Sequence, residues 1–164
     1  LHVLGSKRLS LKWKRDGKYQ PYFYAGKVLK FYGMIGGEEK NTVIRNSQAL
    51  IFPVLIHEAF GLAMIESLYL GCPVIGSHHG SVPELITPEV GLSTSSKSEM
   101  VEALKNIGQF SRKICHEYAR DTFSHIAMSK KYLNYYEQVL NGHPLHDGAP
   151  HCPGNLDIEL TLDA

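Results

Sequence analysis

The stretch 51–84 constrains the fold of this chain more than any other part, because it predicts a strand, a loop, a helix, a second strand and a second loop. The apolar run 49–52 is too short for a buried helix and ends at Pro53, which cannot donate a hydrogen bond to a sheet. The next apolar run, 73–76, opens into the polar turn 77–80. Two strands joined through a helix in this way form a right-handed crossover, so the stretch predicts a parallel sheet.

The helix between these two strands has a recognisable start and end. It is predicted to begin at Phe60 or Gly61, and Gly71 and then Pro73 supply a left-handed cap and a stop. Its apolar residues recur at helical spacing: Leu62, Met64, Ile65, Leu68 and Tyr69.

The start of this helix is the part of the sequence best suited to an anion. Gly61 leaves the first N–H groups uncovered, and the helix dipole adds partial positive charge there. A larger side chain at Gly61 is expected to block the anion without disturbing the core. Glu58 precedes the helix and Glu66 lies within it. By spacing alone such a pair is more typical of a dipole-stabilising acid and a solvated acid, but it also fits a ligand that carries hydroxyl groups on both sides of a phosphate.

Composition excludes several classes of function. With 17 Lys and Arg against 16 Asp and Glu, the net charge of +1 does not favour nucleic acid or an anionic membrane. The nine histidines form no metal-ligand spacing, so no metal is expected. Cys72, Cys115 and Cys152 are odd in number and widely spaced, which indicates reduced thiols. No signal peptide or membrane-spanning run is recognised, so a cytoplasmic location is expected.

The remaining segments predict an α/β domain with a mainly parallel sheet of about five strands and helices on both faces. Further strands are predicted at 1–4, at 28–32 and after Pro88, and helices at 38–46, 82–86, 112–122, 124–140 and from Ser98. The helix from Ser98 is expected to bury Met100, Val101, Leu104 and Ile107, and the last helix to use Tyr132, Tyr135 and Tyr136 for packing. Residues 1–140 are predicted to form one domain and residues 141–164 a mobile tail.

Three blocks of this sequence resemble a known family. They are His57-Glu-Ala-Phe-Gly-Leu-Ala-Met-Ile-Glu66, Gly71-Cys-Pro-Val-Ile75 and Gly80-Ser-Val-Pro-Glu84. In this order and spacing they are similar to the Glu-x7-Glu signature region of retaining family-4 glycosyltransferases, which have the GT-B fold. Weaker similarity extends from Leu1 to about Leu140. The resemblance implies the carboxyl-terminal, donor-binding half of such an enzyme, a Rossmann-like domain whose first strand has no counterpart in this chain.

The resemblance also implies roles for individual residues. Glu58 would bind the donor sugar at the catalytic centre, and Glu66 would bind the ribose hydroxyls. The N–H groups of Phe60, Gly61 and Leu62 would bind the phosphates or the sugar oxygens.

Other residues would complete the donor site by the same resemblance. The backbone of Ile35 to Gly37 and the side chain of Lys40 would border the nucleobase. Gly80 and Ser81 look like the family's Gly-Gly-x-x-Glu loop, with Ser81 in place of the second glycine. Neither a metal nor a cofactor is implied, because helix N–H groups and basic side chains neutralise the diphosphate.

The function implied is transfer of a hexose from a nucleotide diphosphate sugar such as a UDP or GDP sugar to an acceptor, with retention, in glycan biosynthesis. The isolated chain is expected to be inactive, since the acceptor-binding domain, through which any peripheral membrane contact would be made, would come from elsewhere. The alternative is a nucleotide-binding module or subunit without turnover of its own, completed by a separate acceptor domain. A sugar-nucleotide epimerase of the same fold is disfavoured, because no His or Asp pair is placed for proton abstraction.

Overall fold

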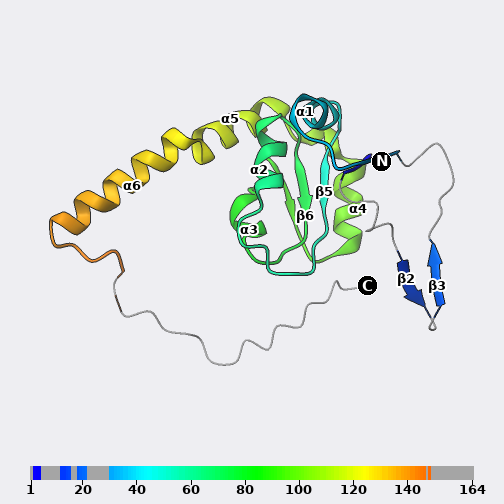
Figure 1. The fold of residues 1–164 in the computed structure, drawn as a ribbon, viewed down its shortest axis with the longest axis horizontal. Helices are drawn as coiled ribbons and strands as arrows, with labels where there is room; N and C mark the ends of the chain where they lie inside the picture. The colour runs from blue at the N-terminus through cyan, green and yellow to red at the C-terminus, as the bar shows by residue number, and fades with distance from the viewer. Residues whose placement is uncertain (1, 5–11, 16–17, 22–29, 147, 149–164) are drawn as a thin grey trace. The chain divides into compact units, whose positions relative to one another are not determined.

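The computed structural model describes residues 2–4, 12–15, 18–21, 30–146 and 148, with side chains from residue 32 onward. The chain divides into two compact units, Leu1–Ser47 and Gln48–Ala164 (Figure 1). The domain boundary predicted at residue 140 stays a prediction, and most of the predicted tail lies outside the described residues.

The first unit contains two pairs of strands and one helix. Strand β1 (His2–Leu4) pairs in parallel with β4 (Lys30–Gly33), whereas β2 (Lys12–Arg15) pairs antiparallel with β3 (Lys18–Pro21). Helix α1 (Gly37–Arg45) follows β4. The first strand, the strand ahead of Gly33 and the helix after it therefore occur as the sequence predicts.

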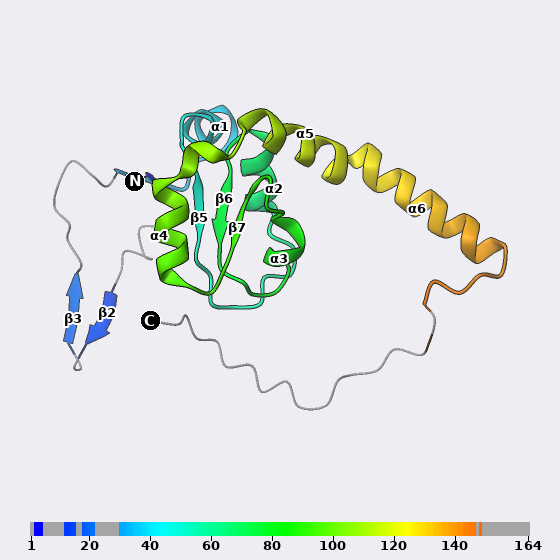
Figure 2. The ribbon, with the colours of Figure 1, turned by 180° about the vertical axis from the view of Figure 1, so that it is seen from behind.

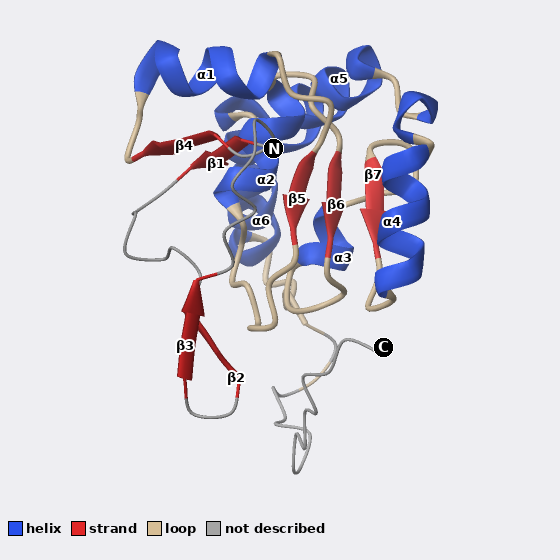
Figure 3. Ribbon diagram, turned by 90° about the vertical axis from the view of Figure 1, so that its right-hand side faces the viewer, coloured by secondary structure: helices blue, strands red, loops and turns tan. Residues whose placement is uncertain are grey.

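The second unit alternates short strands with helices. Its elements are β5 (Leu50–Phe52), α2 (Leu62–Tyr69), β6 (Val74–Gly76), α3 (Val82–Leu85), β7 (Gly91–Ser93), α4 (Lys97–Lys105), the 3-10 helix η2 (Ile107–Gln109), α5 (Arg112–Phe123) and α6 (His125–Leu140). Strands β5, β6 and β7 form one parallel sheet in that order, and Figure 3 shows them side by side. The predicted α/β class is confirmed, although the five predicted parallel strands belong to two sheets rather than one.

Strand β6 is the centre of the core, because its successive side chains point to opposite faces of the sheet. Val74 and Ile75 are both fully buried. Val74 packs with residues of α2, α3 and α5, and Ile75 packs with Met100 and Ala103 of α4. Figures 1 and 2 show the corresponding layers, with α2 and α3 on one face of the sheet and α4 on the other.

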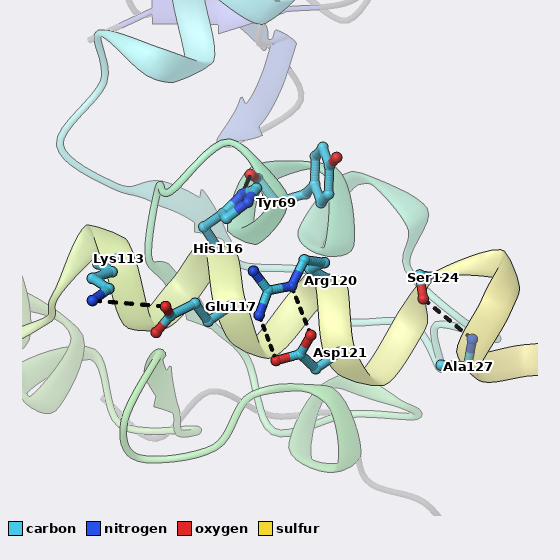
Figure 4. A network of polar contacts seen from close by, with 8 residues as sticks. All are labelled: Tyr69, Lys113, His116, Glu117, Arg120, Asp121, Ser124 and Ala127. Carbon is cyan, nitrogen blue, oxygen red and sulfur yellow. Dashed lines mark hydrogen bonds and ion pairs between the residues drawn. The ribbon is translucent and has the colours of Figure 1, made fainter.

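Helix α5 forms hydrogen bonds to the carboxyl-terminal ends of α2 and α3. The Nδ1–H of His116 donates to the carbonyl oxygen of Tyr69 at the end of α2 (Figure 4), and the hydroxyl of Tyr118 donates to the carbonyl oxygen of Leu85 at 3.1 Å. Cys115 is fully buried as a free thiol, and this burial raises its pKa to about 11. It is therefore a packing residue and not a reactive thiolate at neutral pH.

Helix α4 begins slightly earlier than predicted. Its N-cap is Ser96, whose hydroxyl accepts the N–H of Glu99 at 3.3 Å, and the helix starts at Lys97 instead of Ser98. The prediction that Val101 is buried is wrong, since its side chain is 45% exposed while Ala103 is buried. The buried stripe runs through Met100 and Ala103, three residues apart, and Val101 lies beside this stripe.

Helix α6 continues from α5 (Figure 2) and contains no buried residue. Tyr132, Tyr135 and Tyr136 are 53%, 47% and 59% exposed. Tyr132 and Tyr136 contact each other, with ring centroids 6.2 Å apart, but none of the three tyrosines is buried within the described residues.

Two loops at the carboxyl edge of the sheet are joined to each other. They are residues 53–61, after β5, and residues 77–81, after β6. The N–H of Ser77 donates to the carbonyl oxygen of Phe52 at 3.1 Å, and the Ser77 hydroxyl donates to that of Val54. Further along, the N–H of Ser81 donates to the carbonyl oxygen of Glu58 at 2.9 Å. The second loop therefore fixes the backbone of the first.

Gly80 allows the closest approach between these loops. Its backbone is left-handed, with a φ of +59°, and a Cβ atom there would lie 2.4 Å from both the N and the O of Glu58. No residue with a side chain can take this place without moving the Glu58 peptide.

We expect Gly80→Ala to lower the free energy of unfolding by about 2 to 4 kcal/mol, because it adds left-handed strain to overpacking. Gly108→Ala is the matched control, since nothing lies within 4 Å of its Cβ position and its φ is not positive. The control should change stability by no more than about 0.5 kcal/mol in urea denaturation. Equal stability of the two variants would contradict the close contact at Glu58.

Candidate functional site

The start of α2 presents uncapped backbone N–H groups. Gly61 is the N-cap, with left-handed angles of φ 83° and ψ 53°, and no side chain caps the helix. The N–H groups of Met64 and Ile65 donate to the carbonyl oxygen of Gly61 at 2.9 and 3.4 Å. Leu62 and Ala63 therefore carry the first-turn N–H groups, which have no acceptor within a helix. The first turn itself contains no acidic residue, so none of its own side chains offsets the positive end of the helix dipole.

The helix starts at Leu62, later than predicted, because Gly61 is left-handed. Of the three predicted N–H donors, Phe60, Gly61 and Leu62, only Leu62 belongs to the first turn. The expectation that a larger side chain at Gly61 would leave the core intact is wrong. Gly61 is buried, and a Cβ atom there would lie 2.1 Å from the Cε atom of the fully buried Met64.

The two predicted carboxylates occupy different positions around this helix start. Glu58 is half-buried, and its Cγ atom is 3.4 Å from the Cβ position of Gly61. Glu66 is exposed on α2, about one turn beyond Leu62. The structure therefore brings Glu58 directly beside the uncapped helix start.

Gly80 and Ser81 lie against Glu58, as the joined loops require. Ser81 is the N-cap of α3 and has ordinary helical angles, φ −75° and ψ −11°. Its position does not need a glycine, which explains why serine is tolerated where the related loop has a second glycine.

Ile35, Gly37 and Lys40 belong to the first unit. Gly37 is the first residue of α1, and the N–H of Lys40 donates to the carbonyl oxygen of Gly36 at 3.4 Å. Ile35 and Lys40 are half-buried. Their place beside a nucleobase stays a prediction.

Two histidines that the sequence analysis did not single out lie in the joined loops. His79 is only 9% exposed, and its ring meets the ring of His57 edge-on, with 6.2 Å between centroids and 81° between planes. Its Nε2 atom has no hydrogen-bond partner in the described part of the chain, and neither does the buried hydroxyl of Ser81. The sequence offered one signal for His79, which is its place in the polar turn after a buried strand.

A cavity of about 350 Å³ lies along β7. Its lining includes His78, Ile86, Pro88, Leu92, Ser93 and Phe110, and none of the predicted site residues. The Nδ1 atom of His78 and the hydroxyl of Ser93 are 3.0 Å apart, so these two polar groups already satisfy each other.

The described residues contain neither a cluster of metal ligands nor a membrane-spanning helix. Within them, no group of three or more His, Cys, Asp and Glu side chains is arranged to hold a metal ion. None of the described helices is both long enough and apolar enough to span a membrane.

Solved structures of two glycosyl-transferring enzymes have a similar fold. One is a glycosyltransferase involved in avilamycin A biosynthesis, with a TM-score of 0.55 and 18% identity over 70% of this chain and 37% of its own. The other is sucrose-phosphate synthase from Thermosynechococcus elongatus, with a TM-score of 0.53 and 24% identity over 71% of this chain and 31% of its own. The chain thus spans about a third of the length of either enzyme.

Among curated protein sequences, none matches the chain significantly. The sequence profile described as Glycosyl transferases group 1 matches residues 24–121, which is more than half of the 164 residues and includes the helix start, Glu58, Glu66 and the joined loops. The fold is that of the GT-B glycosyltransferases. The chain belongs to the glycosyl transferases group 1 family.

Proposed function

We propose that this chain binds a nucleotide diphosphate sugar and acts as the donor-binding half of a retaining family-4 glycosyltransferase that transfers a hexose. The observation that carries the proposal is the uncapped start of α2 with Glu58 beside it. Membership of the family supports the general class of reaction, and the geometry supports the donor site.

The diphosphate of the donor belongs at the start of α2. The N–H groups of Leu62 and Ala63 need acceptors, and phosphate oxygens provide them. The charge that develops on the leaving diphosphate is stabilised by the same N–H groups and by the helix dipole. This arrangement supplies electrostatic support without a metal ion.

The carboxylates Glu58 and Glu66 bind hydroxyl groups on either side of the diphosphate. A carboxylate accepts hydrogen bonds but repels phosphate, so each needs a hydroxyl donor from the ligand. Glu58, next to the helix start, holds the donor sugar while the sugar becomes oxocarbenium-like. Glu66, further along α2, holds the ribose. A UDP or GDP sugar has hydroxyls at both places.

We further propose that Ile35, Gly37 and Lys40 border the nucleobase. The acceptor is bound by a further domain or a partner chain, since this chain covers only 37% and 31% of the solved enzymes of similar fold. This partial coverage also favours one alternative function. The chain would then be a nucleotide-binding subunit that catalyses no transfer until a separate acceptor domain completes the active site.

Glu66→Ala tests the ribose assignment. Loss of charge-assisted hydrogen bonds should weaken nucleoside diphosphate binding by roughly 1 to 3 kcal/mol, which titration calorimetry with UDP, GDP and ADP measures as a higher Kd. Glu102→Ala is the control, because Glu102 is an exposed glutamate on another helix, α4. A 2′-deoxynucleotide should bind the wild type as weakly as the ribonucleotide binds the mutant. Unchanged Kd in Glu66→Ala would exclude ribose binding by this carboxylate.

A transfer assay separates the half-enzyme from a self-sufficient enzyme. The purified 164 residues are mixed with labelled sugar nucleotides and a panel of lipid and glycan acceptors. We expect no transfer above background, because the acceptor must be held against the donor for reaction. Product formation by this chain alone would refute the half-enzyme proposal.

A further inference from the structure

Two unpartnered polar atoms mark the loop that contacts Glu58. Among the residues whose side chains the structure describes, His79 Nε2 and Ser81 Oγ are the buried side-chain nitrogen and oxygen atoms without a hydrogen-bond partner. They are two residues apart, on either side of Gly80, whose backbone packs against the Glu58 peptide. Both residues also contact the first loop, since the His79 ring lies edge-on to that of His57 and the N–H of Ser81 donates to the carbonyl oxygen of Glu58.

Leaving these atoms without partners is costly. An unsatisfied buried polar group costs about 1 to 3 kcal/mol, which is a large part of the stability of a small domain. Elsewhere the same loops satisfy their polar groups, since the Ser77 hydroxyl donates to Val54 and His78 Nδ1 faces the Ser93 hydroxyl. When unsatisfied polar atoms are found together in one loop, a ligand that supplies their hydrogen-bond partners is a physical explanation for them.

The chemistry of the cluster selects a hydroxyl-rich ligand. A neutral imidazole and a serine hydroxyl can each donate or accept a hydrogen bond, whereas the Glu58 carboxylate only accepts. A phosphate only accepts hydrogen bonds, so it cannot form one with the Glu58 carboxylate. Sugar hydroxyls both donate and accept, so they match all three side chains.

We propose that His79 and Ser81 recognise the donor sugar, with His79 Nε2 and Ser81 Oγ forming hydrogen bonds to its hydroxyl groups next to those held by Glu58. This inference rests on the proposed function and adds the residues that select the sugar. His57 is exposed and its ring packs edge-on against His79, on the solvent side of the pair.

His79→Phe replaces the imidazole by an aromatic ring without nitrogen, and His78→Phe is the matched control on the adjacent, exposed residue. Titration calorimetry on the full chain measures Kd for UDP, GDP and ADP and for UDP-glucose, GDP-mannose and ADP-glucose. For the nucleotide that binds, His79→Phe should raise the Kd of the sugar nucleotide roughly tenfold and leave the Kd of the diphosphate unchanged, as expected for loss of about one hydrogen bond. His78→Phe should change neither Kd.

Thermal unfolding without ligand distinguishes recognition from a structural role. Replacing an unpartnered polar ring by an apolar ring of similar shape should leave the Tm of His79→Phe equal to or above that of wild type. If His79→Phe fails to fold, His79 is a structural residue and its assignment is overturned. Ser81→Ala, which removes only the hydroxyl, then tests the same sugar preference at the other atom.

The results of these experiments distinguish sugar recognition by His79 and Ser81 from the proposed binding of a nucleotide sugar. A wild type that binds none of the diphosphates overturns the proposed function and the inference together. A wild type that binds them, with His79→Phe and Ser81→Ala leaving the ratio of the two Kd values unchanged, overturns the sugar-recognition role alone. Equal weakening of diphosphate and sugar nucleotide by His79→Phe also contradicts it, because the effect would then not be specific to the sugar.

Discussion

The contact of Gly80 with the Glu58 peptide is the interaction on which the site depends. It is possible only because Gly80 is left-handed and has no side chain, and the N–H of Ser81 adds a hydrogen bond of 2.9 Å to the Glu58 carbonyl oxygen. The backbone of Glu58 is thereby fixed, although it belongs to an irregular loop. The same loop ends at Gly61, whose left-handed turn exposes the first N–H groups of α2 beside the Glu58 side chain.

The rest of the second unit supplies a rigid support for this edge. Val74 and Ile75 fill opposite faces of β6, and His116 and Tyr118 of α5 bind the carbonyl oxygens of Tyr69 and Leu85. An anion site made of backbone N–H groups needs such support, because its affinity comes from donors that are already oriented. In the part of the chain that the structure describes, helix α6 has no buried residue, and its tyrosines are exposed.

The sequence predicted the helix α2, the strands on either side and the stop at Gly71, because hydrophobic period and glycine and proline positions are local signals. It misplaced the start of α2, since the left-handed backbone of Gly61 makes this residue the N-cap and not part of the helix. It also missed His79, whose burial depends on a loop that is distant in sequence. Val101 was predicted to be buried because it is apolar and adjacent to Met100. The sequence pattern does not distinguish a residue at the edge of the buried stripe from one within it.

The central claim is that the first turn of α2 binds the diphosphate. Amide chemical shifts of the isotope-labelled chain, recorded by NMR during titration with the nucleoside diphosphate that binds, test it most directly. We expect saturable shifts at Leu62 and Ala63, with Leu133 on α6 unchanged. Shifts confined to Leu92 and Ser93 beside the cavity along β7, with Leu62 and Ala63 unmoved, would contradict it.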